Sequence, residues 1–170
     1  MTFARIMVRI GILSDTHGFI NPRLFEFFKD CDQIWHAGDW GTVEILDILE
    51  KFKPLNAVYG NIDGKEIRIR LPEILFFEAE KVKVCLLHIG GYPGNYAPGF
   101  KKLLKTHEID LMVCGHSHIL KVMRDPINKF MHINPGACGN SGFQKVNTAI
   151  RLKIEGKKLY DLEVWEQKRE

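Results

Sequence analysis

The sequence lacks several features that mark specialised classes of protein. No stretch approaches the ~18 consecutive apolar residues of a membrane span, so no membrane partner is expected. The four cysteines lie far apart and include no CxxC pair, which excludes a small disulfide-stapled fold. Neither positive nor negative residues are in large excess, because 24 basic and 21 acidic residues leave a net charge of +3. This excess is too small to indicate nucleic acid or anionic lipid as a partner. The remaining composition, 45% hydrophobic and 26% charged over 170 residues, is typical of one globular domain spanning residues 1–170.

The expected location follows from the same absences. The N-terminal segment MTFARIMVRIGIL has no separate basic segment, long apolar segment or small-residue cleavage site, so it is expected to lead into a first strand rather than to act as a secretory leader. Cys85 and Cys114 lie inside apolar, strand-like runs, where a buried free thiol is expected. Both observations favour a reducing compartment, and we expect a cytoplasmic protein.

Strand-like and helix-like segments alternate in the first half of the chain. Strands are predicted at residues 8–13, 33–36 and 55–59, and helices at residues 22–29 and 42–52. This β-α-β-α-β order predicts a parallel sheet with right-handed crossovers. In the second half, strands are predicted at residues 74–79, 82–87, 111–114, 120–124, 129–133, 148–154 and 158–164, with a helix at 99–106 and a frayed tail at 166–170. The pattern as a whole predicts a single mixed α/β domain.

Five predicted strands are followed at once by side chains that can bind metal. In open α/β sheets, functional groups gather beyond the C-terminal ends of the strands. The segments that end this way are GILSDTHG, IWHAGDW, AVYGNID, VCLLHIGG and LMVCGHSH. They contribute Asp15, His17, Asp39, Asn61, His88, His116 and His118. We therefore expect these seven side chains to meet at one edge of the fold.

The chemistry of this set points to a two-metal centre. It supplies carboxylate, amide and imidazole groups but no thiolate, which suits Mn²⁺, Fe, Zn²⁺ or Ni²⁺ better than a sulfur-rich structural zinc. Seven ligands are too many for one four-coordinate ion. With one bridging carboxylate they suit two ions ~3.5–4 Å apart, the arrangement that clamps a phosphoryl group during in-line displacement.

Each motif by itself has a simpler explanation. Asp15 fits an Asx turn at a strand end, Asn61 fits an ordinary turn, and His88 fits a core histidine. The pair His116 and His118 is the strongest single signal for metal. The metal interpretation prevails because five separate strand ends would otherwise have to carry ligand chemistry by chance.

The order SDTHG, GD, GN, H, GHSH resembles the calcineurin-like metallophosphoesterase superfamily. The short chain, with GNID in the third motif and NPGA at residues 134–137, resembles its small single-domain prokaryotic phosphodiesterase branch, and the resemblance runs from residue 11 to about residue 137. It implies an α/β fold of two packed mixed β-sheets flanked by helices, an αββα sandwich. It implies that one ion is bound by Asp15, His17, Asp39 and His118. It implies that the other ion is bound by Asp39, Asn61, His88 and His116, with Asp39 bridging.

The function implied is hydrolysis of a small-molecule phosphoester, above all a phosphodiester, by a hydroxide formed on two divalent ions. Asp39, Asn61 and His88 are the residues we expect at the catalytic centre, and manganese is the expected metal, with nickel, zinc and iron as alternatives. One departure concerns Ile62. Many relatives in the wider superfamily carry a histidine directly after the metal-binding asparagine, where it is thought to assist the leaving group, and isoleucine cannot donate a proton. Leaving-group protonation must then come from water or from another residue.

Two other functions compete with this one. A non-catalytic protein-binding scaffold on the same fold is represented by the retromer subunit of this branch, but that subunit has lost catalytic ligands that are all present here. A nuclease is disfavoured because tracking a phosphate backbone calls for clustered Lys and Arg. Homo-oligomerisation is left open.

Residues 90–99, with the sequence GGYPGNYAPG, follow His88 almost directly. Four glycines and two prolines predict an ordered, turn-rich loop rather than a continued strand. Tyr92 and Tyr96 are amphipathic and can stack on a base or an aryl group, so we expect this loop to form a wall of the substrate pocket. The alternative is that both rings pin the loop onto the domain.

The remaining histidines receive simpler roles. His36, three residues before Asp39, either orients a metal ligand or only ends a strand. His132 is expected to pack, and His107 to lie on the surface. The turn predicted at residues 134–136 is expected to brace the metal-binding loops.

Overall fold

The computed structural model describes residues 7–169; the predicted lead-in segment 1–6 and the last residue of the predicted tail lie outside this range. Within it, the strands form two five-stranded sheets and a two-stranded ribbon. The first sheet contains β1 (Met7–Leu13), β2 (Gln33–His36), β3 (Leu55–Ala57), β11 (Val146–Glu155) and β12 (Lys158–Lys168). The second contains β4 (Ile74–Ala79), β5 (Val82–Leu87), β8 (Leu111–Val113), β9 (Leu120–Arg124) and β10 (Met131–Pro135). The helices and the ribbon are α1 (Arg23–Phe28), α2 (Val43–Phe52), α3 (Lys65–Arg70), α4 (Pro98–Leu103), β6 (Gly91–Tyr92) and β7 (Asn95–Tyr96).

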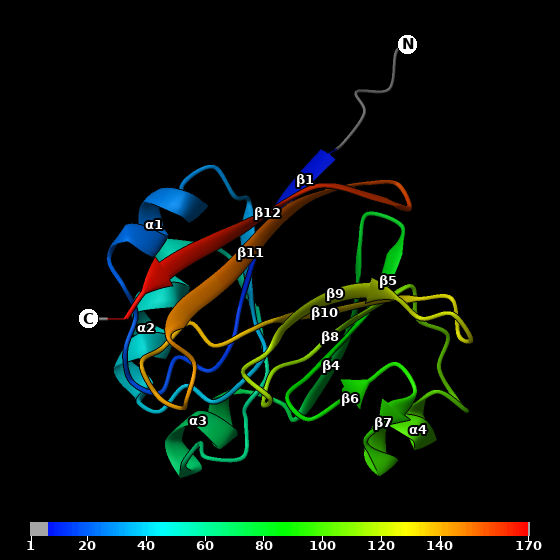
Figure 1. Ribbon diagram of the computed structural model, residues 1–170, viewed down its shortest axis with the longest axis horizontal. Coiled ribbons are helices and arrows are strands. Elements are labelled where there is room, and N and C mark those ends of the chain that lie inside the picture. The colour runs from blue at the N-terminus through cyan, green and yellow to red at the C-terminus, as the bar shows by residue number, and fades with distance from the viewer. Residues whose placement is uncertain (1–6, 170) are drawn as a thin grey trace.

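Both sheets are mixed: the first is parallel on the β3 side and antiparallel on the β12 side, and the second has a parallel centre between two antiparallel edge strands. In the first sheet, of order β12-β11-β1-β2-β3, the strands β1, β2 and β3 pair in parallel, as predicted. In the second, of order β4-β5-β8-β10-β9, the parallel strands are β5, β8 and β10. Figure 1 shows the two sheets facing each other, with α1 and α2 on the outer side of the first sheet and α4 beside the second.

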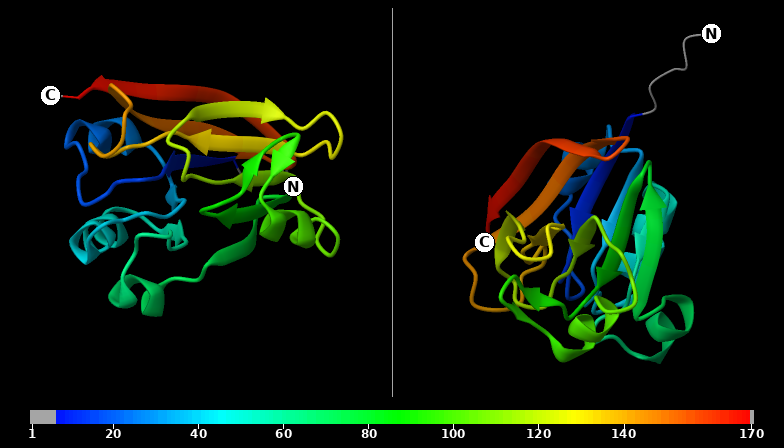
Figure 2. Two further views of the ribbon diagram at one scale, coloured as in Figure 1. Left: turned by 60° about the horizontal axis from the view of Figure 1, so that its bottom comes forward. Right: turned by 90° about the vertical axis from the view of Figure 1, so that its right-hand side faces the viewer.

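Alternation along the strands explains the layering. Ile10 and Ile12 on β1, and Val84 and Leu86 on β5, are buried in one core cluster between the sheets. Leu13 packs outward with α1 and α2, and the residues alternating with Val84 and Leu86 pack outward with α4. Successive side chains of a strand point to opposite faces, so each sheet has two buried faces. The predicted αββα sandwich is confirmed, and the layers are visible in Figure 2.

Three segments differ from the prediction. Residues 65–70 form helix α3, which was not predicted because Ile67 is its sole buried residue and no apolar periodicity marks it. The tail predicted to fray at residue 166 instead continues β12 to Lys168, because Gln167 pairs with Asn147 on β11. Backbone hydrogen bonds to a neighbouring strand can order a segment whose polar composition is typical of a frayed end. The loop 90–99 contains the β6–β7 ribbon, and α4 ends at Leu103 rather than at residue 106.

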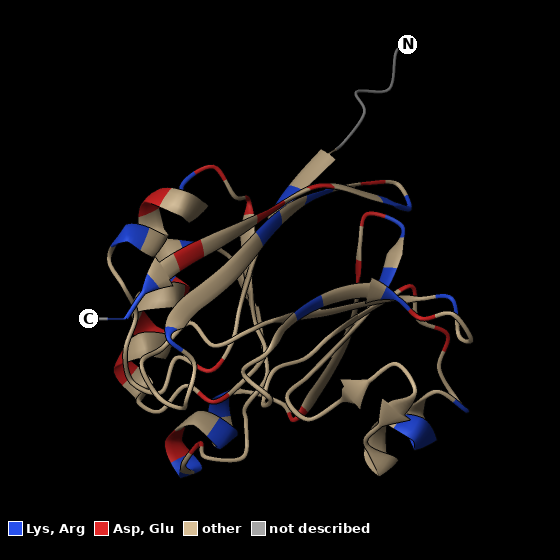
Figure 3. Ribbon diagram, in the orientation of Figure 1, with Lys and Arg blue, Asp and Glu red and all other residues tan. Residues whose placement is uncertain are grey.

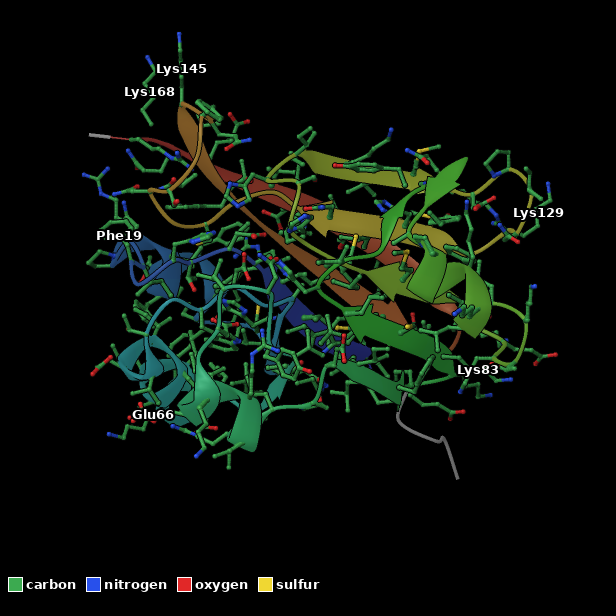
Figure 4. The ribbon with its side chains drawn as sticks, turned by 90° about the horizontal axis from the view of Figure 1, so that it is seen from below. Phe19, Glu66, Lys83, Lys129, Lys145 and Lys168 are labelled. Carbon is green, nitrogen blue, oxygen red and sulfur yellow. The ribbon has the colours of Figure 1, made fainter. Side chains whose placement is uncertain are left out.

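The fold places the predicted ligand-bearing strand ends together. The segments that follow β1, β2 and β5 turn at the lower side of the molecule in Figure 1, the side from which α3 and α4 also project. Figure 4 looks directly onto this side. Lys, Arg, Asp and Glu are mixed along the chain, for example on α3 and along the β11–β12 hairpin (Figure 3). Within residues 7–169, no helix is long and apolar enough to cross a membrane.

Candidate metal centre

Two clusters of potential ligands lie at the ends of the parallel strands. Asp15 and His17 follow β1 and meet His118, which follows β8; we call this group the Asp15 cluster. Its atoms approach closely, since His118 Nε2 lies 3.2 Å from both Asp15 Oδ1 and His17 Nε2. These residues, of which His118 lies about a hundred positions from the other two, are three of the four that the family resemblance assigns to one ion; the fourth is Asp39.

The second group, the His88 cluster, contains Asp39, His88 and His116. His88 Nε2 lies 3.2 Å from Asp39 Oδ1, and the rings of His88 and His116 lie edge to face with centroids 5.2 Å apart. Asn61 is exposed and lines the same pocket as His88. The structure therefore brings the predicted second set of ligands to one place.

Asp39 faces both clusters. Its Oδ1 approaches His88, while its Oδ2 lies 3.7 Å from His17 Nε2 in the Asp15 cluster. His88 Nε2 in turn lies 4.0 Å from Asp15 Oδ1. The two clusters are thus adjacent, and Asp39 lies between them, in the position expected of a bridging carboxylate.

Several acceptor atoms in the clusters face one another without a hydrogen between them, as they would around a bound cation. His88 Nδ1 lies 2.7 Å from the carbonyl oxygen of Ala37, so in the neutral ring this nitrogen carries the proton and Nε2 presents its lone pair to the Asp39 carboxylate. Two acceptors at this distance need a proton or a metal ion between them. Asp15 Oδ1 and His88 Nε2 are buried and find no hydrogen-bond partner among the described residues, and such orphaned atoms are what a metal ion would satisfy.

The local charges shift the pKa values in the corresponding directions. Burial works to lower the pKa of His88, but the Asp39 and Asp15 carboxylates outweigh it and raise the pKa. Contact with Asp15 likewise raises the pKa of His118. Burial would raise the pKa of Asp39, yet the neighbouring His88 and the backbone amide of Ile62 lower it. The clusters favour positive charge next to ionised carboxylates, which is also the requirement of a divalent ion.

Backbone strain is concentrated at the ligands. Positive φ angles in the left-handed region occur at Asp15 (54°), His17 (46°), Asp39 (59°), His116 (70°) and His118 (59°). Such conformations cost on the order of 1–3 kcal/mol each for residues with a Cβ atom, and they persist where the surroundings hold them. Here the strain lets consecutive short turns aim carboxylate and imidazole groups at a common point.

Backbone hydrogen bonds hold the strained loops together. The amides of Asp15, His17 and Gly18 donate to the carbonyls of Gly38, Asp39 and Trp40 over 3.0, 3.1 and 2.7 Å. The loop after β1 is therefore joined to the loop after β2 by consecutive backbone hydrogen bonds. Gly60 is required where the third loop approaches, because an added Cβ would lie 2.0 Å from Asp39 Oδ1.

Asp63 lies two residues after Asn61, in the turn considered there, and its side chain supports the candidate site, a role that was not predicted. Its carboxylate is buried and accepts hydrogen bonds from the backbone amides of Asp39, Trp40, Gly41 and Gly60. These bonds tie Asp39 to the loop that carries Asn61. The signal available in the sequence was a carboxylate two residues after the asparagine in GNID, which propensity alone cannot distinguish from an Asx turn.

The other predicted supporting residues take structural roles. His36 is fully buried, stacks on Trp40 and hydrogen-bonds Thr16 Oγ1 through Nε2 at 3.1 Å, so it braces the loops rather than only ending a strand. Asn134 belongs to β10 instead of a turn, and its Nδ2 donates to the carbonyl oxygen of Gly115 and to Ser117 Oγ. The expected bracing of the metal loops by this segment is confirmed. His132 is buried as predicted.

The two predicted substrate contacts, Tyr92 and Tyr96, line the same pocket beside His116 but differ in burial. The Tyr92 ring is half-buried and lines a pocket that includes His116. Its hydroxyl donates a hydrogen bond to Oγ of Ser117, the residue between His116 and His118 in the sequence. The Tyr96 ring is 6% exposed and packs in the core under α4, and its hydroxyl donates to Asp125 Oδ2 at 2.5 Å. Tyr96 thus anchors the segment, which is the alternative role considered for it.

Comparison with known proteins places the chain in a family. The calcineurin-like phosphoesterase superfamily domain matches residues 8–157, and the chain belongs to this superfamily. It is 31% identical over 157 residues to a probable metallophosphoesterase of Methanothermobacter thermautotrophicus, covering 88% of each chain. A structure described as a novel archaeal phosphodiesterase is similar with a TM-score of 0.69 and 23% identity over 92% of this chain and 99% of that one. The Vps29 of Entamoeba histolytica complexed with zinc is similar with a TM-score of 0.71 and 16% identity over 94% and 98%.

Proposed function

We propose that this chain hydrolyses phosphodiesters, with phosphomonoesters as further substrates, by means of two divalent ions held in the Asp15 and His88 clusters. The observation that carries the proposal is the position of Asp39, whose two oxygens face His88 on one side and His17 on the other. One carboxylate shared by two histidine-bearing clusters is the arrangement that two-metal phosphoesterases require.

The division of labour follows from the donor set. When bound, the two ions lower the pKa of coordinated water and neutralise the charge that develops on the phosphoryl oxygens. The chain's own residues hold this arrangement: Asp39 lies between the clusters, His88 is oriented through Ala37, and Asn61 contributes an amide at the exposed edge. A thiol nucleophile is not needed, and burial raises the pKa of Cys114 to about 12, so this thiol stays protonated.

The choice of diester and of metal is supported by similar structures and by the chemistry of the donor atoms. The archaeal phosphodiesterase that shares the fold supports a diester substrate. The oxygen and nitrogen donors support manganese, with nickel, zinc and iron as alternatives. The zinc complex of the similar Vps29 supports a fold able to hold divalent metal.

The proposed substrate is a small molecule. Lys and Arg positions are interspersed with Asp and Glu along the ribbon in Figure 3, and this mixture together with the small net charge of +3 favours a small molecule over nucleic acid or an anionic membrane. Segment 90–99 is the proposed substrate wall, with Tyr92 facing the pocket beside His116 and Tyr96 fixing the segment to the core. We also propose a cytoplasmic location, which the four free cysteines support.

The test is hydrolysis by metal-reconstituted protein. Bis(p-nitrophenyl) phosphate should be cleaved faster than p-nitrophenyl phosphate, and Asp39→Asn should abolish both activities. Asp47→Asn is the matched control, because Asp47 is an exposed carboxylate on α2 that pairs with Arg70. A wild-type chain that carries two ions and cleaves neither ester would overturn the proposal and leave the protein-binding scaffold as the better alternative.

A further inference from the structure

A pocket adjoins the His88 cluster on the side of α3 and α4. Asn61 and His88 form part of its wall. Most of the remaining lining is apolar and comes from Ile74, Leu87, Ile89, Phe100 and Leu103. The one carboxylate in the lining, Glu73, accepts a hydrogen bond from the Tyr59 hydroxyl at 3.2 Å. We call it the α3–α4 pocket, after the two helices that project on this side in Figure 1 and Figure 4.

Arg68 lines this pocket with a guanidinium group that several contacts hold in place. Its Nε donates to the carbonyl of Asp63 at 2.6 Å, and its Nη2 donates to the carbonyls of Gly60 and Asn61 at 3.1 Å each. The guanidinium also stacks over the Tyr59 ring, 4.3 Å from its centroid. None of these partners is a carboxylate, and no described carboxylate forms an ion pair with Arg68, whereas Arg70 on the same helix pairs with Asp47 and Glu50.

We propose that the α3–α4 pocket binds one ester group of the substrate, and that this group is aromatic or heteroaromatic. The inference rests on the proposed function and adds a substrate class to it. Three observations converge: two of the expected metal ligands line the pocket, its body is apolar, and the guanidinium of Arg68, which is hydrogen-bonded to carbonyl oxygens rather than paired with a carboxylate, lies beside Asn61, where its charge complements an anionic phosphate. An apolar ring would bury its faces against Ile74 and Phe100, which a methyl ester could not do to the same extent.

Gly99 offers a way to close the pocket without disturbing the fold. It lines the pocket in the first turn of α4. An added Cβ there would meet nothing within 4 Å, and its φ angle is not in the left-handed region. Gly99→Leu should therefore fill pocket space while leaving the core intact. Gly64→Leu is the matched control, because an added Cβ at Gly64 also enters open space and Gly64 does not line the pocket.

The experiment compares two non-hydrolysable probes, phenylphosphonate and methylphosphonate, which carry the same anionic head. Their dissociation constants for metal-loaded protein are measured by titration calorimetry. The wild type should bind phenylphosphonate roughly tenfold more tightly than methylphosphonate. Gly99→Leu should bring this ratio close to one with methylphosphonate affinity unchanged, and Gly64→Leu should keep the wild-type ratio.

Two results would overturn the inference. Equal affinity of the wild type for both probes would do so without any variant, and an undiminished phenyl preference in Gly99→Leu would place the ring elsewhere. Either result leaves hydrolysis by the wild type untouched. Failure of the wild type to cleave any ester with both ions bound would instead overturn the proposed function, so the two failures are distinguishable.

Discussion

The carboxylate of Asp63 accepts a hydrogen bond from the backbone amide of Asp39 at 3.1 Å, across 24 positions of sequence. One buried carboxylate therefore fixes the position of another, and the second is the one that faces both ligand clusters. The bridging geometry at Asp39 depends on this support as well as on the strand that precedes it.

Replacing Asp63 by asparagine should destabilise the protein and weaken metal binding. Oδ1 accepts from Trp40 and Gly41, and Oδ2 accepts from Asp39 and Gly60. In asparagine an NH2 group replaces one of these two oxygens, so a donor would face the backbone N–H donors. We expect this to lower the free energy of unfolding by about 3 kcal/mol. Urea denaturation of the metal-free protein measures this cost. Asp47→Asn should change it by only a few tenths of a kcal/mol, and equal effects of the two variants would contradict the role of Asp63.

Metal stoichiometry should separate the bridging residue from a ligand of one cluster. The wild type, reconstituted and desalted, should approach about two divalent ions per chain by elemental analysis. Asp39→Ala should weaken both sites because Asp39 faces both clusters, whereas His118→Ala, which removes a contact to Asp15, should mainly empty one. His107→Ala is the control, since this exposed ring stacks on Phe76. A wild type that retains no divalent metal would refute the metal centre altogether.

Leaving-group chemistry should show the consequence of Ile62. This side chain is 47% exposed and follows Asn61, and it cannot protonate a departing oxygen. The rate of the chemical step should therefore depend steeply on leaving-group acidity, with aryl diesters cleaved much faster than alkyl ones. Ile62→His should flatten the dependence, and Ile62→Leu should preserve it. Equal rates across a series of aryl diesters, with chemistry rate-limiting, would contradict the absence of a general acid.

Stability should depend on pH through Asp125. Burial works to raise its pKa, but hydrogen bonds from Asn128 and Tyr96 outweigh it and lower the pKa from 3.8 to about 2. A depressed folded-state pKa stabilises the native state above the unfolded-state value, and this stabilisation is lost as the pH falls through about 2. Asp125→Asn should cost about 2 kcal/mol at pH 7 and much less near pH 2. A cost that does not change with pH, measured by denaturation at both values, would contradict this account.

Substrate selectivity should change when the two tyrosines of segment 90–99 are removed. Tyr92→Ala/Tyr96→Ala should alter the ratio of kcat/KM between small and bulky phosphodiesters while metal content stays constant. Tyr96→Ala alone should act mainly on stability, because its ring is buried with Phe100 and Phe130. If the double variant slows every substrate by one common factor, the segment is only structural.

The ligand residues could be predicted from the sequence because local chemistry marks them. The candidate ligands each lie within five residues of the end of an apolar strand, and the C-terminal ends of parallel strands meet at one edge of a sheet: Asp15, His17, Asp39, His88 and His118. The nearly continuous apolar runs of β1 and β5 likewise indicate strands that are buried on both faces. These features depend on residues within a few positions of one another.

Only the tertiary structure decided how the ligands are held and what surrounds them. Asp63 reads locally as a turn residue, and its role arises because the chain returns beneath Asp39 after a strand and a helix. The α3–α4 pocket joins Asn61 and His88 to Phe100, which no local pattern connects. The same reason separates Tyr92 from Tyr96: they are similar in sequence, but the β6–β7 ribbon places one beside Ser117 and buries the other. Sequence periodicity specifies which faces are apolar, whereas contacts between distant segments are settled by packing the whole chain.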